Sequence, residues 1–331
     1  MDGGSEFYLR FDHALVKVRA DSQELSGSLK DYLKHHLVKK GPAQAAVSLK
    51  YKKILSPIPT HARAALRYYG LKAFMDRGRT YFTDFRSYLT LEPDGKKAIA
   101  FISPETIEES GMHFFTHIFF TISLFELLRH HGVFFLHSAG LISPGGKSYV
   151  FPASAGQGKS TLVVYLLREG YKYLSDDTIF LTNSTGKVSL TGFEKVSHLP
   201  EEVVARFEEL KSFKDAPRLG SKGKKLVDLE LAFPERRVGE SKASGAIIFL
   251  NKIDGVKSAL KPLSKIEAFH LLLGQSPFAY VNPELAQSHF DIFREFLAGN
   301  RVWLLDSGRD WVENPKVLTN ILESAVSERR N

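Results

Sequence analysis

One segment of the chain limits the possible folds more than any other: a glycine-containing loop between an apolar strand and an apolar helix. The loop reads Phe151-Pro-Ala-Ser-Ala-Gly-Gln-Gly-Lys-Ser-Thr161, and Leu162–Leu167 follows it. Gly156 and Gly158 let the backbone turn so that successive N–H groups point inward, and the helix N-terminus adds partial positive charge. This strand, loop and helix predict a P-loop that holds the phosphates of a nucleotide.

Individual positions of the loop have predicted roles. Lys159 is expected to bridge the terminal phosphates, and Ser160 to bind Mg²⁺. The predicted nucleotide-binding residues of the loop are Ser154, Ala155, Gly156, Gln157, Gly158, Lys159, Ser160 and Thr161. Ala153 replaces the first glycine of the usual Gly-x-x-x-x-Gly-Lys-Ser/Thr pattern. The prediction therefore depends on the flanking strand and helix, and a glycine-rich turn without a ligand is the alternative.

Two adjacent acids follow the loop helix. Asp176 and Asp177 interrupt two apolar strand segments. Neighbouring side chains of a strand point to opposite faces, so a kink is needed for both carboxylates to reach the phosphates. One carboxylate near Mg²⁺ would neutralise the metal, while the second would accept the proton of an attacking hydroxyl. The pair predicts phosphoryl transfer, and a solvated turn between strands is the alternative.

Two further segments are candidates for the site. His137 ends the predicted strand Val133–Leu136, so we expect it at a carboxyl end of the sheet, where α/β proteins bind ligands. A hydrogen-bonded core histidine is the alternative. The basic loop Arg218–Lys225 includes Lys222 and Lys224, each beside a glycine that permits close approach to a ligand. We expect these lysines to lie over the nucleotide or an anionic acceptor, unless the loop is only a solvated connection.

The pattern of strands and helices changes at Pro104. Residues 1–104 predict a small α+β domain with strands at Phe7–Phe11 and Leu15–Val18 and a helix capped by Ser22; acceptor recognition is its expected role. In residues 105–331 strands alternate with helices, which indicates an α/β core around a largely buried sheet.

Composition excludes some chemistry. The chain has no cysteine, so disulfides, thiolate metal sites and cysteine nucleophiles are ruled out. The apolar stretch Phe114–Leu128 contains His117 and Glu126 and is shorter than the ~20 apolar residues of a membrane span. The N-terminus lacks the basic start and apolar core of a signal peptide. We therefore expect a cytoplasmic protein without a membrane span.

Positive charge is concentrated at the start of the chain. Residues 1–100 contain 18 Lys and Arg against 10 Asp and Glu, which accounts for the whole net charge of +8. A basic region can attract an acidic protein or nucleic acid over long range. The alternative is a solvated, lysine-rich surface.

The site residues together resemble a known family. His137, the loop Ala153–Ser160 and the segment Ser175-Asp-Asp177 resemble the HPr kinase/phosphorylase family and its relatives. In that family a histidine precedes the loop by about this interval, and an acidic pair follows the loop lysine at the spacing found between Lys159 and Asp176. The resemblance covers residues 130–182. It implies a P-loop kinase core on a mixed sheet, like that of phosphoenolpyruvate carboxykinase, beside the smaller N-terminal domain.

The resemblance also implies cofactors and roles. ATP and Mg²⁺ are the implied cofactors. Lys159 would bind the β- and γ-phosphates, Ser160 and Asp176 would hold the metal, and Asp177 would be the base. His137 would lie close to the transferred phosphoryl group. The implied activity is a kinase that phosphorylates an aliphatic hydroxyl, such as a serine of a protein, a peptide precursor or free serine.

Several alternatives stay open. The family's phosphorylase signature is not recognisable in residues 190–231, so neither the reverse reaction nor HPr as substrate is implied. A nucleotide-sensing module that transfers no phosphate is one alternative, and Ala153 favours it. A nucleic-acid-binding ATPase is another, because of the basic first hundred residues. The family tendency also implies a homo-oligomer.

Overall fold

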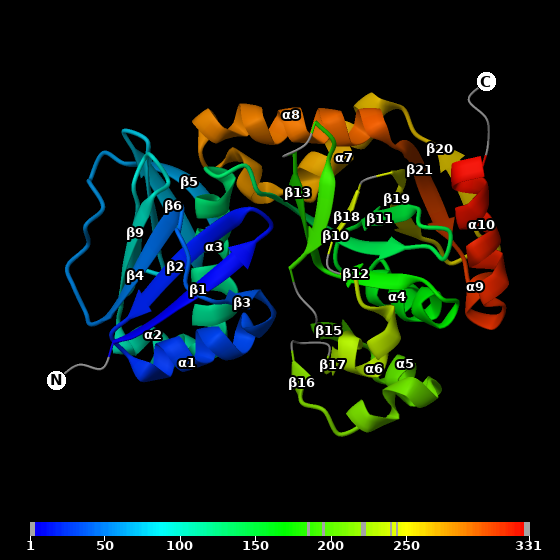
Figure 1. Ribbon diagram of the computed structural model, residues 1–331, viewed down its shortest axis with the longest axis horizontal. Helices are drawn as coiled ribbons and strands as arrows, with labels where there is room; N and C mark the ends of the chain where they lie inside the picture. Colours follow the sequence, from blue (N-terminus) through cyan, green and yellow to red (C-terminus); the bar gives the residue numbers. More distant parts are fainter. Residues whose placement is uncertain are drawn as a thin grey trace. The chain divides into compact units, whose positions relative to one another are not determined.

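The computed structural model describes residues 4–183, 186–193, 196–219, 223–238, 240–242 and 244–327. These residues form two compact units (Figure 1). The first unit comprises Met1–Phe134 and Pro277–Phe290, and the second comprises Phe135–Ser276 and Asp291–Asn331. The division thus differs from the expected break at Pro104: the helical stretch after Pro104 belongs to the first unit, and a later segment returns to it.

A nine-stranded sheet forms the framework of the first unit, in the order β3-β1-β2-β4-β9-β8-β7-β6-β5. The strands are β1 Ser5–Phe11, β2 Ala14–Ala20, β3 Leu37–Val38, β4 Ala45–Tyr51, β5 Arg63–Tyr68, β6 Leu71–Asp76, β7 Arg79–Thr83, β8 Tyr88–Leu91 and β9 Lys97–Ile102. β1 and β2 confirm the two predicted strands. Asp12 adopts a left-handed conformation (φ 52°) in the two-residue turn between them, as a short polar residue can.

Helices pack on this sheet. α1, Gln23–Tyr32, begins at the predicted cap Ser22, whose side chain accepts a hydrogen bond from the amide of Leu25. α2 Pro104–His113, the π-helix Phe114–Phe120 and α3 Thr121–Arg129 follow one another. This stretch of 26 residues is long and apolar enough to cross a membrane, but 67% of its most apolar window is buried in the structure. The core helix of a soluble protein meets the same criteria.

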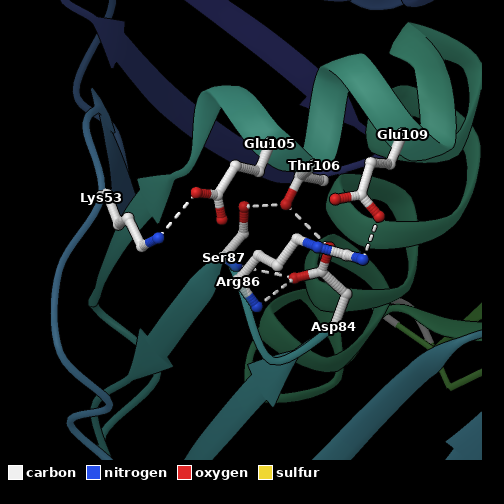
Figure 2. Close-up of polar contacts among 7 residues, drawn as sticks. All are labelled: Lys53, Asp84, Arg86, Ser87, Glu105, Thr106 and Glu109. Carbon is white, nitrogen blue, oxygen red and sulfur yellow. Dashed lines mark hydrogen bonds and ion pairs between the residues drawn. The ribbon is translucent and has the colours of Figure 1, made fainter.

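A partly buried polar network connects the turn between β7 and β8 to α2. Asp84 accepts hydrogen bonds from the amides of Arg86 and Ser87 and from the hydroxyl of Thr106. Figure 2 shows the Asp84 carboxylate between the turn and the helix, with the Ser87 and Thr106 hydroxyls 2.6 Å apart. Backbone amides and hydroxyls therefore satisfy this carboxylate within the first unit.

The second unit is built on a larger mixed sheet. Its order is β18-β14-β13-β10-β11-β19-β21-β20, with β12 paired to β10. The strands are β10 Phe134–Ile142, β11 Ser148–Pro152, β12 Lys172–Ser175, β13 Thr178–Thr182, β14 Ser189–Gly192, β18 Glu240–Lys242, β19 Gly245–Lys252, β20 Ala259–Pro262 and β21 Arg301–Ser307. β19 runs parallel to β11 and β21, whereas β10 is antiparallel to β11. The predicted mixed α/β sheet is confirmed.

Apolar packing fixes the second unit. Ala246, Ile248 and Leu250 of β19 are in one core with residues of α4 and α10, while Ile247 and Phe249 are buried on the opposite face. Both faces of the central strand are therefore covered, which explains its continuous apolar sequence. The helices are α4 Lys159–Arg168, α5 Glu201–Arg206, α6 Leu229–Ala232, α7 Lys265–Gly274, α9 Asp310–Glu313 and α10 Pro315–Ser327, and α8 Pro283–Gly299 begins in the first unit and ends in the second.

A small antiparallel sheet completes the second unit. It consists of β15 Val196–Leu199, β17 Lys224–Asp228 and β16 Arg218–Leu219, in that order across the sheet. β15 lies against α4, and Figure 1 shows the three short strands beside α5 and α6. The predicted basic loop is therefore partly strand, and its Lys222 lies outside the described residues.

Candidate functional site

The loop between β11 and α4 has the backbone shape that its glycines predicted. Gly156 and Gly158 have φ values of 92° and 90°, and Gly158 precedes the first helical residue, Lys159. Residues with a side chain rarely adopt these φ values, so any other residue at either position would be strained. The amides at the start of α4 therefore open into the loop, as anion binding at a helix N-terminus requires.

Two glutamine side chains hold the loop in place. Gln157 Oε1 accepts a hydrogen bond of 2.8 Å from the amide of Lys252 at the end of β19. Gln275 Nε2 donates to Ser154 Oγ over 3.4 Å, and its carbonyl accepts the amide of His137. The loop is thus connected to strands on either side of it, which fixes its shape before any ligand binds.

Lys159 points inward from the first turn of α4. Its side chain is buried, and Nζ lies 2.5 Å from the carbonyl oxygen of Ala153 and 2.7 Å from Nε2 of His137. Burial lowers the pKa of Lys159, and the charge of Lys224 on β17 adds to this, although Asp177 and Asp176 act in the opposite direction. The lysine is therefore a desolvated cation between the two aspartates.

His137 connects Lys159 to Asp177. A charged ammonium can only donate, so Nε2 of His137 is the acceptor and Nδ1 carries the proton. Nδ1 lies 3.5 Å from Oδ1 of Asp177, whose side chain is 49% exposed. Burial acts to raise the pKa of Asp177, but the hydrogen bond from His137 and the charge of Lys159 hold this pKa below its usual range. Asp177 is an ionised, accessible carboxylate.

Asp176 has a different environment. It is 2% exposed. Tyr173 donates to Oδ1 over 3.1 Å, Ser197 donates to Oδ2 over 2.5 Å, and Ser160 is a third hydroxyl partner. Burial raises the pKa of Asp176, and the neighbouring charge of Asp177 raises it further, against the three hydrogen bonds. The side chains that donate hydrogen bonds to Asp176 are thus all neutral.

The bend between β12 and β13 places the two carboxylates in these different environments. β12 ends at Ser175, β13 begins at Thr178, and the backbone carbonyl of Asp177 accepts the amide of Ser138 on β10. Both carboxylates still act electrostatically on Lys159. The structure therefore brings together the predicted residues His137, Lys159, Ser160, Asp176 and Asp177.

The residues present fit a hard cation such as Mg²⁺. Among the described residues no group of three or more His, Asp or Glu side chains could hold a metal by itself. Mg²⁺ in nucleotide sites commonly uses only one or two carboxylates together with phosphate oxygens and water. Ser160 and the buried carboxylate of Asp176, which face each other, are such a donor set.

Three residues near the site were missed by the sequence reasoning. Tyr173 and Ser197 hold Asp176, and His198 on β15 contributes to the lowered pKa of Asp177. Tyr173 could have been noticed three residues before the acidic pair. Nothing in the sequence marks Ser197 or His198, because β15 reaches the site only through tertiary packing.

Comparison with known proteins adds little to this geometry. No protein-family model matches the chain, and no curated protein matches it. The solved structures to which it is similar include the HPr(Ser) kinase/phosphatase from Coxiella burnetii, with 11% sequence identity and a TM-score of 0.30. The match covers 57% of this chain and 94% of that one. A likeness at this TM-score says nothing about the activity of this chain.

Proposed function

We propose that this protein is an ATP-dependent kinase that transfers the γ-phosphoryl group to an aliphatic hydroxyl, in the manner of HPr kinase-related enzymes. The observation that carries the proposal is the division between two adjacent carboxylates. Asp176 is buried among hydroxyls beside Ser160, and Asp177 is accessible beside His137 and Lys159. This division matches the two tasks of phosphoryl transfer, which are to hold a metal and to accept a proton.

The nucleotide phosphates would lie against the 153–158 loop and the start of α4. The amides there supply donors, and phosphate oxygens would replace His137 and the Ala153 carbonyl as partners of Lys159. Ser154 to Thr161 are the proposed nucleotide-binding residues, with Lys224 near enough to Lys159 to add positive charge. A nucleoside triphosphate is favoured because one lysine and one helix N-terminus converge on the same point.

Ser160 and Asp176 would hold Mg²⁺. The metal, when bound, would neutralise charge on the β- and γ-phosphates. Asp176 can serve because its carboxylate is buried and its donors are neutral, so a cation would balance its charge. This assignment gives the metal to the buried aspartate rather than to the exposed one.

Asp177 would act as the general base. The acceptor oxygen forms a bond to the γ-phosphorus, and the bond from that phosphorus to the β–γ bridging oxygen breaks. ADP leaves with the electron pair of that bond. The proton of the acceptor hydroxyl passes to the Asp177 carboxylate, which His137 and Lys159 keep ionised and oriented.

Radiolabel transfer tests the proposal. The protein is incubated with γ-labelled ATP, Mg²⁺ and a panel of free serine, serine peptides and a cell lysate, and labelled products are identified by mass. Lys159→Ala should abolish transfer and weaken nucleotide binding. Asp177→Asn should retain nucleotide binding and lose transfer by about 10²–10⁴-fold, the range for removal of a general base.

Matched controls separate chemistry from folding. Lys316→Ala and Asp31→Asn make the same substitutions at exposed residues of α10 and α1 and should leave transfer unchanged. A fully active Asp177→Asn variant would exclude the base assignment. ATP binding without any labelled product would instead indicate a nucleotide-sensing module.

A further inference from the structure

We propose that Ser197 and Tyr173 are positioning residues that fix the metal-binding carboxylate of Asp176, so that the small sheet is a working part of the site. This inference rests on the function proposed above. It concerns two side chains that contact neither nucleotide nor acceptor in that proposal.

The two oxygens of Asp176 are held by donors from two different elements. Oδ1 accepts from Tyr173 on β12 over 3.1 Å, and Oδ2 accepts from Ser197 on β15 over 2.5 Å. A carboxyl group held at only one oxygen can still rotate about its Cβ–Cγ bond. With both oxygens held, the group has one orientation, in which it also accepts a hydrogen bond from Ser160.

Ser197 reaches Asp176 only because of the small sheet. Its partner across the sheet is Val227 on β17, and both residues are completely buried. β15 also packs on α4, the helix that carries Ser160. The position of the Ser197 hydroxyl therefore depends on the docking of β15 between α4 and β17.

Burying the Asp176 carboxylate among hydroxyls costs folding free energy, and a purely structural role does not explain that cost. Asp176 is a buried carboxylate whose side-chain donors are all neutral, so its charge is solvated less well than in water. An apolar side chain in place of Asp176 would pack there without the cost of a buried charge. Outer partners of metal-ligating carboxylates are the known use of such an arrangement, and their loss typically weakens metal binding by about 10–100-fold.

Metal binding, rather than activity, tests the inference. Mn²⁺ is titrated into the full-length protein saturated with a non-hydrolysable ATP analogue, and free Mn²⁺ is followed by its electron paramagnetic resonance signal. The analogue alone provides the blank. Ser197→Ala and Tyr173→Phe should each weaken Mn²⁺ binding by about 10–100-fold. Ser197→Thr, which keeps a hydroxyl, should recover most of the wild-type affinity.

Matched variants remove equivalent groups elsewhere in the second unit. Tyr149→Phe deletes a buried hydroxyl that donates to the Leu322 carbonyl, and Ser189→Ala truncates a buried serine of β14. Both should bind Mn²⁺ like the wild type, even where they lower the melting temperature. The same controls show that loss of stability alone does not weaken metal binding.

Two results would overturn the inference, and they differ. Wild-type affinity in folded Ser197→Ala and Tyr173→Phe variants would reject the positioning role and leave the proposed kinase intact. A wild-type protein that binds the analogue but adds nothing to its affinity for Mn²⁺ would reject the metal site at Asp176, and with it the metal-dependent part of the proposed function.

Discussion

The two units each bury a carboxylate, and they satisfy it in opposite ways. In the first unit Glu126 is 1% exposed and lies 2.6 Å from the guanidinium of Arg129, which also donates to the carbonyls of Phe278 and Ala279. In the second unit Asp176 is equally buried but receives only neutral hydroxyls.

The two carboxylates differ in whether a cationic side chain of the same unit is hydrogen-bonded to them. Burial raises the pKa of Glu126, but Arg129 opposes it from within the same unit. Burial also raises the pKa of Asp176, and no described side chain forms an ion pair with that carboxylate. Glu126 therefore has its counter-charge within the fold, although its Oε1 accepts no hydrogen bond. Asp176 has only the longer-range charge of Lys159, without a hydrogen bond from it, and is suited to a cation that arrives with a ligand.

The largest effect is expected when the internal pair is broken. Arg129→Met leaves Glu126 buried without its counter-charge and deprives two carbonyls of their donor. The free energy of unfolding of the first unit should fall by about 3–5 kcal/mol. Hydrogen exchange of the β1 to β9 amides measures this. Both tryptophans, Trp303 and Trp311, belong to the second unit, so their fluorescence reports separately on that unit.

Removal of the charge from Asp176 should act on ligand binding instead. Asp176→Asn keeps the shape of the side chain and removes an unbalanced buried charge, so the unliganded protein should be no less stable than the wild type. The stabilisation by Mg²⁺ and ATP should be lost, about 2.7 kcal/mol when the ligand is at 100 times its Kd. Thermal unfolding by tryptophan fluorescence, with and without ligand, measures both quantities. A large loss of stability without ligand would contradict the comparison.

A smaller effect is expected at the carboxylate in Figure 2. Asp84→Ala leaves the amides of Arg86 and Ser87 and the Thr106 hydroxyl without their acceptor. The free energy of unfolding of the first unit should fall by about 1–3 kcal/mol, the cost of unsatisfied buried donors. Chemical denaturation followed by hydrogen exchange measures the change, and nucleotide binding should be unaffected. Altered nucleotide affinity would show that the turn is not purely structural.

A pH dependence of stability is also expected in the first unit. Burial, with the neighbouring charges of His131 and Arg129, lowers the pKa of His130 to about 4 from its usual 6.5. The unfolded chain therefore binds more protons than the folded one between these values, and stability falls as the pH drops from 6.5 to 4. His130→Gln should reduce the slope of unfolding free energy against pH in this window. An unchanged slope would exclude His130 as its source.

Several residues that the sequence patterns named lie together in the structure, whereas the division into units differs from the predicted break. The phosphate loop and the acidic pair are local signals, since Gly156, Gly158 and Asp176 to Asp177 stand in one short stretch between apolar elements. The alternation of strands and helices predicted for residues 105–331 is present in the second unit. Ser197 was missed because β15 reaches Asp176 only through packing, which no local pattern records.

The first unit shows the same limit. β5 was missed, because none of its side chains is buried and its sequence does not alternate between apolar and polar residues. The division at Pro104 was expected from a change in pattern. The structure instead places the apolar helices after Pro104 with the first sheet, since their buried faces need that sheet.

The return of Pro277–Phe290 to the first unit governs how the chain can fold during synthesis. Arg129 lacks two of its acceptors, the carbonyls of Phe278 and Ala279, until the ribosome has passed most of the second unit. The first unit can therefore be completed only after the enclosed segment has emerged, at ~5–20 residues per second. A fragment cut at Phe134 would keep a buried guanidinium with unmet hydrogen bonds, so the two units are best expressed as one polypeptide.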